Sequence, residues 1–240
     1  MAKNKKQGFE TRAIHAGQEA DPATGAVMMP IYTSSTFKQE SPGVHKGYDY
    51  SRSGNPTRKA FEECMASLED GIKGYGFSSG VAAISACVEL LEPGDHVIAM
   101  DDLYGGTVRL FNEIKTKSQG INITYVDMTD FDNVEKAYTD KTKMIFVETP
   151  TNPLLKIADL EKIANFAKEK KILSVCDNTF ASTYIQKPLN FGIDIVLHSA
   201  TKYLGGHSDL IAGVLVIGKD DKSLLETMAN IQNSLGPITS

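Results

Sequence analysis

Two hydrophobic patterns alternate along most of the chain. Short apolar runs rich in branched residues predict buried strands, and apolar residues spaced at i, i+3, i+4 and i+7 predict amphipathic helices. Phe61, Cys64, Met65 and Leu68 show the helical spacing, and Pro56 suits the first turn of that helix. The predicted strands are residues 75–77, 96–100, 121–126, 144–147, 172–176, 193–197 and 213–217, and further helices are predicted at 81–91, 108–117, 131–138, 160–167 and 222–235.

This alternation predicts the fold class and the division of the chain. Strands that alternate with helices indicate an α/β fold built on a largely parallel sheet. Residues 1–56 lack sustained periodicity and contain many glycines and prolines, so we expect an extended N-terminal arm that rests on a second subunit. Residues 57–240 then form the α/β domain.

Composition excludes several classes of protein. A hydrophobic fraction of 41 % in 240 residues permits a sizeable core. The net charge of −5 offers no basic excess for a nucleic-acid partner. No apolar segment follows the basic start and no apolar run reaches the length of a membrane helix, so we expect neither a signal peptide nor a membrane span.

The cysteines and histidines argue against disulfides and metals. Cys64, Cys87 and Cys176 lie within apolar patterns, and their odd number without ligand spacing indicates reduced thiols in a reducing compartment such as the cytoplasm. The histidines show no metal-ligand spacing either, so we expect no metal site.

The clearest candidate chemistry follows two of the predicted strands. Asp177 comes directly after strand 172–176, and the polar segment Ser199–Lys202 follows strand 193–197. Ligands of parallel sheets bind beyond the carboxyl ends of the strands, so a carboxylate, two hydroxyls and a lysine are expected in one cleft. This set suits pyridoxal phosphate, with the lysine as Schiff base, the carboxylate on the pyridine nitrogen and the hydroxyls on the phosphate. Taken singly, Asp177 or Lys202 is equally compatible with a helix cap or a salt bridge.

Two further turns between a strand and a helix could contact such a cofactor. The turn Ser79–Gly80 leads into a nearly all-apolar helix, whose free N–H groups could bind phosphate; a capped helix with a tight turn is the alternative. Tyr104 follows strand 96–100 and could stack on a flat heterocycle, or simply cover a loop.

Two loops carry weaker signals. Asn152 lies in a loop fixed by two prolines, where its amide could bond a cofactor oxygen or a substrate carboxylate; an ordinary rigid turn is the alternative. Arg52, close to Tyr50, is of the type that binds phosphate with two hydrogen bonds, although most arginines lie on the surface without such a role.

Six ordered segments resemble those of the trans-sulfuration (Cys/Met metabolism) family of pyridoxal-phosphate enzymes of fold type I. The resemblance runs from about residue 8 to the end of the chain and is greatest to the cystathionine γ-lyases and γ-synthases. It implies the large domain of that fold, a mostly parallel seven-stranded sheet with helices on both faces. The segments are residues 50–57, 79–80, 102–107, 148–153, 177–180 and 199–209.

The resemblance also implies roles by position. Lys202 would form the Schiff base, Asp177 would pair with the pyridine nitrogen, and Tyr104 would stack on the ring and assist proton transfer. Tyr50 and Arg52 would reach the phosphate of a neighbouring subunit, which makes a homodimer the smallest active unit and a homotetramer the usual one. The residues expected at the pyridoxal 5′-phosphate are Tyr50, Arg52, Ser79, Gly80, Val81, Tyr104, Asn152, Asp177, Ser199, Thr201 and Lys202.

The chain departs from the family pattern in two places. Val81 stands where methionine or leucine is common, which a phosphate-binding backbone N–H tolerates. At Ser240 the family members continue into a smaller C-terminal domain that supplies an arginine for the substrate carboxylate. We therefore expect that domain to be absent.

The implied activity is that of a carbon–sulfur lyase that cleaves an amino-acid substrate, cystathionine, in the manner of a γ-lyase. The alternatives are a γ-synthase, which joins cysteine to an acylated homoserine, and a non-catalytic cofactor-binding fragment. Cystathionine β-lyase and methionine γ-lyase follow, and Gly106 disfavours the latter because those enzymes carry cysteine there.

Overall fold

A seven-stranded sheet forms the centre of the molecule, for which a computed structural model describes residues 7–239. The strand order is β1-β7-β6-β5-β4-β2-β3, and β7 alone runs antiparallel to its two neighbours. The strands are β1 (Lys73–Phe77), β2 (His96–Met100), β3 (Asn122–Val126), β4 (Thr142–Glu148), β5 (Leu173–Asp177), β6 (Ile195–Ser199) and β7 (Gly213–Ile217). The predicted α/β fold with a mostly parallel sheet is confirmed.

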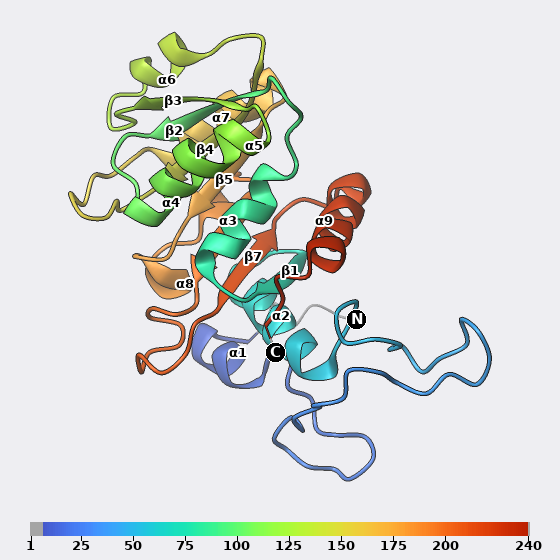
Figure 1. The fold of residues 1–240 in the computed structure, drawn as a ribbon. Coiled ribbons are helices and arrows are strands. Elements are labelled where there is room, and N and C mark those ends of the chain that lie inside the picture. The colour runs from blue at the N-terminus through green and yellow to red at the C-terminus, as the bar shows by residue number, and fades with distance from the viewer. Residues whose placement is uncertain (1–6, 240) are drawn as a thin grey trace.

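Helices cover both faces of this sheet (Figure 1). The connections from β1 to β2 and from β2 to β3 run in one direction across the sheet. Those from β4 to β5 and from β5 to β6 run in the opposite direction. Right-handed crossovers therefore place α3, α4 and α5 on one face and α7 on the opposite face. The helices are α1 (Phe9–His15), α2 (Pro56–Leu68), α3 (Gly80–Val88), α4 (Gly105–Arg109), α5 (Thr116–Ser118), α6 (Asp132–Ala137), α7 (Leu160–Lys170), α8 (Ser182–Ile185) and α9 (Lys222–Leu235), with a π-helical turn at Leu110–Lys115 and a 3₁₀ turn at Pro188–Phe191.

Local sequence explains where the main helices begin. Asn55 caps α2 by accepting hydrogen bonds from the N–H groups of Thr57 and Arg58, and Pro56 occupies the first turn. Asp159 caps α7 and Asp221 caps α9 in the same way, through the N–H groups of Lys162 and Leu224. These caps fix the helices over the sheet, where their apolar faces pack into the core.

Two hydrophobic cores lie against opposite faces of strands β6 and β7. The larger includes Phe77, Phe111 and Phe146, whose side chains are fully buried. The smaller joins Met65 of α2 to Val196 of β6 and to strand β7. Because Val196 and Leu197 belong to different cores, alternate residues of β6 face opposite sides of the sheet.

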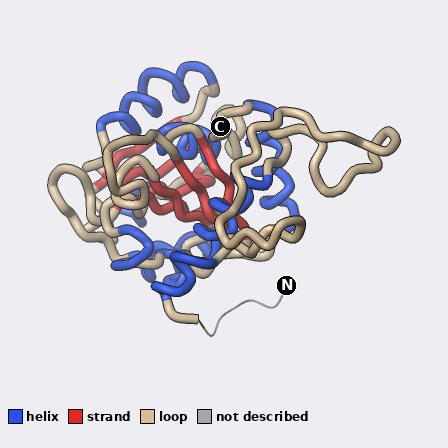
Figure 2. The backbone as a smooth tube through the Cα atoms, turned by 90° about the horizontal axis from the view of Figure 1, so that it is seen from below, coloured by secondary structure: helices blue, strands red, loops and turns tan. Residues whose placement is uncertain are grey.

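The N-terminal segment differs in part from its prediction. It contains one helix, α1, which has no buried residue and packs against α2. Residues 16–55 contain no further helix or strand, and Figure 2 shows much of this segment as a loop that extends away from the sheet. The predicted boundary of the arm at residue 56 stays a prediction, and residues 1–6 lie outside the described part.

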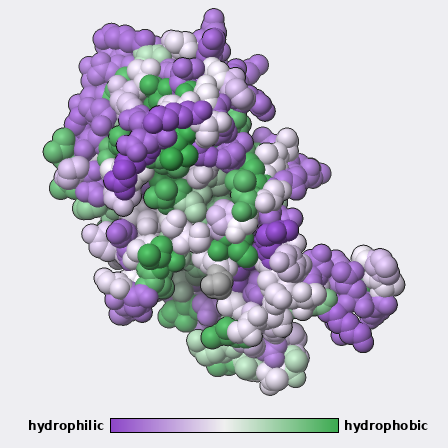
Figure 3. Space-filling view, viewed as in Figure 1, coloured by the Kyte–Doolittle hydropathy of each residue, from purple (hydrophilic) through white to green (hydrophobic). Residues whose placement is uncertain are grey.

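Exposed apolar side chains are unevenly distributed over the molecule. In Figure 3 hydrophilic residues dominate around α6 and β3 and at the tip of the projecting segment, whereas green patches lie near the middle of the molecule. Val27, Met28 and Ile31 of the N-terminal segment are strongly exposed. None of the helices described between residues 7 and 239 is long and apolar enough to cross a membrane.

Candidate active site

The carboxyl ends of β4, β5 and β6 bring three polar side chains to one edge of the sheet. Glu148, the last residue of β4, is in register with Asp177, the last residue of β5. Asp177 is in turn in register with Leu197, two residues before the end of β6 at Ser199. The sequence prediction ended these strands too early: the hydrogen-bonded ladder continues through Asp177, and through His198 and Ser199, although their side chains are polar.

Asp177 is held by one neighbour, Thr179, which is not among the predicted site residues. Thr179 donates to Asp177 Oδ1 from its backbone N–H at 3.0 Å and from its hydroxyl at 2.6 Å. The same hydroxyl accepts the backbone N–H of Ser199 at 2.8 Å. Thr179 therefore joins the ends of β5 and β6, and leaves Asp177 Oδ2 without a hydrogen bond from residues 7–239. A threonine two residues after an aspartate is a recognisable turn pattern, and this pattern in the sequence could have indicated the role of Thr179.

Burial dominates the electrostatics of Asp177. It raises the pKa of the carboxyl, while the hydrogen bonds from Thr179 and, when it is protonated, the nearby His198 lower it. A buried carboxylate needs a partner, and a protonated ring nitrogen at the open Oδ2 would supply one.

Glu148 is a second buried carboxyl at this edge, also outside the predicted site. Its Oε2 accepts the N–H of Tyr104 and its Oε1 accepts the N–H of Asn152, both at 3.0 Å. Burial and the nearby charge of Asp177 raise the pKa of Glu148 to about 8. Glu148 thus ties together the loops that carry Tyr104 and Asn152.

The turn Ser79–Gly80 forms a narrow cradle beside Ser199. The side chain of Ser79 caps α3 by accepting the N–H of Ala82 at 3.1 Å. A Cβ on Gly80 would lie 2.6 Å from the Cβ of Ser199, so only glycine fits. The N–H groups of Gly80 and Val81 donate to no residue of the described chain, and such free donors at a helix start fit a phosphate. The predicted phosphate residues Ser79, Gly80, Val81 and Ser199 are therefore adjacent.

Lys202 lies in the turn that follows β6. Its backbone N–H donates to Ser199 O at 3.1 Å, and Thr201 exchanges hydrogen bonds with Ala212. The side chain of Lys202 is exposed, and its amine has no hydrogen-bond or ion-pair partner among residues 7–239. The rings of Tyr203 and Phe180 pack edge to face with centroids 6.2 Å apart. This contact joins the turn of Lys202 to the turn of Asp177, on the same edge of the sheet.

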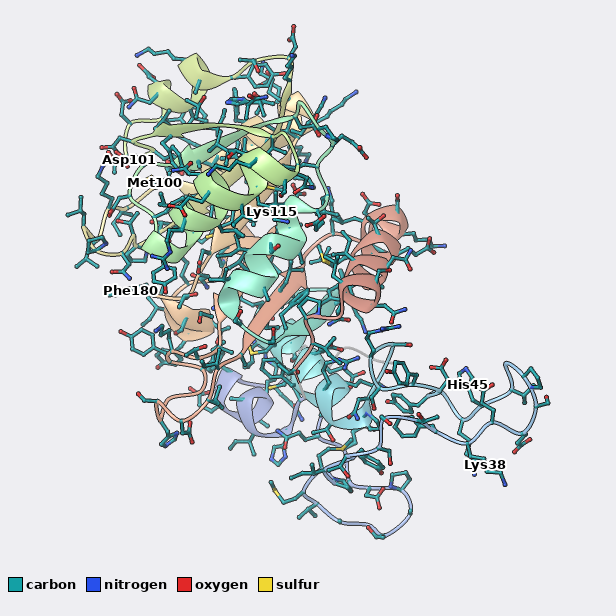
Figure 4. The ribbon with its side chains drawn as sticks, in the orientation of Figure 1. Lys38, His45, Met100, Asp101, Lys115 and Phe180 are labelled. Atoms are coloured by element: carbon teal, nitrogen blue, oxygen red, sulfur yellow. The ribbon has the colours of Figure 1, made fainter. Side chains whose placement is uncertain are left out.

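Tyr104 and Asn152 lie on loops at that edge. Tyr104 precedes α4 and the residue is 43 % exposed, so solvent or a ligand can reach it. A Cβ on Gly106 would overlap the ring of Tyr104, so this glycine determines where the ring can lie. Asn152 is exposed between two cis peptide bonds, at Thr149–Pro150 and Asn152–Pro153. Figure 4 labels Asp101 and Phe180, which follow β2 and β5, on the side of the molecule where these loops lie.

Two of the predicted residues, Tyr50 and Arg52, have no described side-chain interaction with the residues at this edge of the sheet. The Arg52 guanidinium lies 5.4 Å from the centre of the Tyr50 ring, and its Nε donates to Asn233 Oδ1 at 3.3 Å. Both belong to the N-terminal segment, whose labelled residues Lys38 and His45 project away from the sheet in Figure 4. Neither side chain hydrogen-bonds to the turn Ser79–Gly80 of its own chain.

These features fit the cofactor site of pyridoxal-phosphate enzymes of the α/β type, and comparisons with known proteins show the family of the chain. Residues 10–240 match the family described as Cys/Met metabolism PLP-dependent enzyme. The chain is 58 % identical over 237 residues to a cystathionine β-lyase of Coxiella burnetii, covering 99 % of this chain and 61 % of the relative. It is 48 % identical over 235 residues to a cystathionine γ-synthase of Mycobacterium leprae, covering 97 % of this chain and 60 % of the relative.

A solved structure shows the same fold. The crystal structure of cystathionine γ-lyase from Lactobacillus plantarum complexed with L-serine superposes with a TM-score of 0.94 at 49 % identity, over 98 % of this chain and 60 % of that chain. This chain belongs to the Cys/Met metabolism family of pyridoxal-phosphate-dependent enzymes, and it spans about 60 % of the length of the relatives it matches. The cofactor of the family is pyridoxal 5′-phosphate.

Proposed function

We propose that this chain carries the cofactor site of an enzyme that cleaves the carbon–sulfur bond of cystathionine, in the manner of a γ-lyase. The observation that carries the proposal is the link between Asp177, Thr179 and Ser199, which joins the predicted ring-nitrogen and phosphate sites through one hydroxyl. The free N–H groups of Gly80 and Val81 support it independently.

We assign each residue at this edge a role. The N–H groups of Gly80 and Val81 and the hydroxyls of Ser199 and Thr201 bind the phosphate, that of Thr201 after giving up its hydrogen bond to Ala212 O. Asp177 accepts the ring N–H, and Asn152 orients the substrate. When bound, the cofactor withdraws electrons from the substrate's α-carbon. Lys202 attaches the cofactor before the reaction and then moves protons at the substrate, with Tyr104 stacked on the ring and assisting proton transfer.

The assembly that we propose is a homodimer or a larger homo-oligomer. Tyr50 and Arg52 make no hydrogen bond to the Ser79–Gly80 turn of their own chain, and they precede α2 on a segment with exposed apolar side chains. We propose that they complete the phosphate site of a second copy. Sedimentation equilibrium tests this, and a monomer at micromolar concentration that still binds the cofactor fully would contradict it.

The compartment that we propose is the cytoplasm. Cys64, Cys87 and Cys176 are free thiols, and burial raises the pKa of each, which suits a reducing environment. Cell fractionation with an antibody against the chain tests this proposal, and recovery in an oxidising compartment would contradict it.

A second candidate has direct support from the comparisons. The relative at 58 % identity is named a cystathionine β-lyase, and the relative at 48 % a γ-synthase. The two lyases break the carbon–sulfur bond on opposite sides of the same sulfur atom, whereas the synthase forms such a bond.

Product analysis separates these activities. The protein loaded with pyridoxal 5′-phosphate is incubated with cystathionine and water, or with an acylated homoserine and cysteine. A γ-lyase releases cysteine, 2-oxobutanoate and ammonia, and a β-lyase releases homocysteine, pyruvate and ammonia. Cystathionine formed from the second mixture indicates a synthase. The proposal predicts 2-oxobutanoate, and pyruvate as the main 2-oxo acid would overturn it in favour of the β-lyase.

A further inference from the structure

A fully buried pair, Glu69 and His198, lies behind the candidate cofactor site. Glu69 follows α2 and His198 is in β6; their side chains are 0 % and 1 % exposed, and His198 Nε2 lies 2.5 Å from Glu69 Oε1. Leu197 is in register with Asp177 and shares its face of the sheet, so the next residue, His198, points to the opposite face. The proposed reaction does not use this pair, although burying two such groups is costly.

Asn178 connects the pair to the turn that carries Asp177. Its amide Nδ2 donates to Glu69 Oε1 at 3.2 Å and to the backbone oxygen of Gln186 at 2.8 Å. Gln186 in turn donates to Asn178 Oδ1 at 2.9 Å and to Thr149 O at 2.8 Å. Asn178 lies between Asp177 and Thr179 in the chain, so these bonds fix the backbone of both.

The charges around Asp177 are few. It is faced by Glu148 from β4, by Cys87 from α3 and by its neighbour Cys176, and burial keeps both thiols neutral by raising their pKa. His198 faces Glu69, whose charge, like those of Asp177 and Glu148, raises the pKa of Cys176. When protonated, His198 lowers the pKa of Asp177. Among the described residues, His198 is therefore the group whose protonated form favours an ionised Asp177.

We propose that Glu69, His198 and Asn178 form a positioning network for the ring-nitrogen site, which holds Asp177 in place and keeps it ionised from the opposite face of the sheet. This inference rests on the proposed role of Asp177 as partner of the ring nitrogen. His198 and Glu69 touch neither cofactor nor substrate; they act through Asp177. A purely structural pair would stabilise the fold without distinguishing one cofactor ring from another.

The test compares two ligands that differ in one atom. Pyridoxal 5′-phosphate and its 1-deaza analogue, in which carbon replaces the ring nitrogen, are titrated into the protein, and the ratio of their dissociation constants is measured. The unsubstituted protein prefers the natural cofactor. His198→Gln reduces this preference by about fivefold, the size expected when one nearby charge is lost. Glu69→Gln, which keeps an acceptor for Asn178, reduces it in the same direction.

Two controls separate positioning from packing. Val196→Ala removes buried volume from the same strand and the same face, and it leaves the ligand preference unchanged even if both affinities fall. In an Asp177→Asn background, His198→Gln has no further effect on the ratio. Circular dichroism establishes that each variant is folded, and Glu69→Gln alone decides the question if His198→Gln does not fold.

Each outcome bears on a different claim. A ligand preference that is unchanged in both His198→Gln and Glu69→Gln overturns the inference and leaves the proposed function intact. Failure of the unsubstituted protein to bind pyridoxal 5′-phosphate overturns the proposed function and the inference together. Binding without any preference for the ring nitrogen overturns the role of Asp177, and the inference with it.

Discussion

Thr179 donates two hydrogen bonds to one oxygen of Asp177, from its backbone N–H at 3.0 Å and its hydroxyl at 2.6 Å. The hydroxyl also accepts the N–H of Ser199, the residue that faces Gly80 across the phosphate cradle. One side chain therefore sets the spacing between the two groups that would hold opposite ends of the cofactor. It also favours the ionised form of Asp177, because both bonds lower the pKa of that carboxyl against the effect of burial.

Thr179→Val removes the hydroxyl and keeps the shape of the side chain. We expect pyridoxal 5′-phosphate affinity to fall about tenfold, the value of one hydrogen bond to a charged group. Without the hydroxyl the pKa of Asp177 rises, so cofactor binding shifts to higher pH. Absorbance titration across a pH series measures both effects. Thr179→Ser is the control that keeps the hydroxyl, and equal affinities in the Val and Ser variants would exclude this role.

The raised pKa of Glu148 predicts how stability depends on pH. A carboxyl whose pKa is higher in the folded state stabilises the fold fully below its unfolded value of 4.5, and this contribution is lost as the pH rises to about 8. Urea unfolding of the cofactor-free protein between pH 5 and 9 should therefore show a loss of stability with rising pH, on the order of 4 kcal/mol at most.

Glu148→Gln isolates this contribution, because an amide cannot ionise. The difference in unfolding free energy between Glu148→Gln and the unsubstituted protein should shift in favour of the variant as the pH rises from 5 to 9. Lys143→Gln, an exposed change on the same strand, serves as the control and should show no such trend. A difference between Glu148→Gln and the unsubstituted protein that does not vary with pH would show that Glu148 is ionised throughout.

Two adjacent glycines test the placement of Tyr104. A Cβ on Gly106 would overlap the Tyr104 ring, whereas a Cβ on Gly105 would meet nothing within 4 Å. Gly106→Ala should displace the ring and weaken pyridoxal 5′-phosphate binding by about fivefold, as the loss of one aromatic contact would. Gly105→Ala should leave the affinity and the spectrum of the bound cofactor unchanged. Similar effects of the two substitutions would show that the ring does not contact the cofactor.

The regular parts of the fold could be predicted from the sequence because burial dictates their composition. Strands β2 and β7 and helix α9 have the predicted bounds, since each presents an uninterrupted apolar run or a clear helical spacing. Helix α1 was missed because it buries no residue and so leaves no hydrophobic pattern. The predicted strand 193–197 lies two residues early, because His198 and Ser199 are polar and still pair in the ladder with β7.

The site could be predicted only in part from the sequence, because some of its contacts join residues that are far apart in the chain. The turns Asp177–Phe180 and Ser199–Lys202 could be found because polar residues follow apolar strands. The pair Glu69 and His198 could not, since 129 positions separate them and no local pattern signals their contact. Glu148 was noted only as part of a loop, because its role depends on the N–H groups of Tyr104 and Asn152, which the fold alone brings together.

The most direct test of the account is where pyridoxal 5′-phosphate attaches. The protein is incubated with the cofactor, reduced with borohydride, digested and analysed by mass spectrometry, beside Lys202→Ala and the control Lys168→Ala, an exposed lysine of α7. We predict one pyridoxyl label, on Lys202, that persists in Lys168→Ala and is lost in Lys202→Ala. A label on another lysine, or undiminished labelling of Lys202→Ala, would contradict the account.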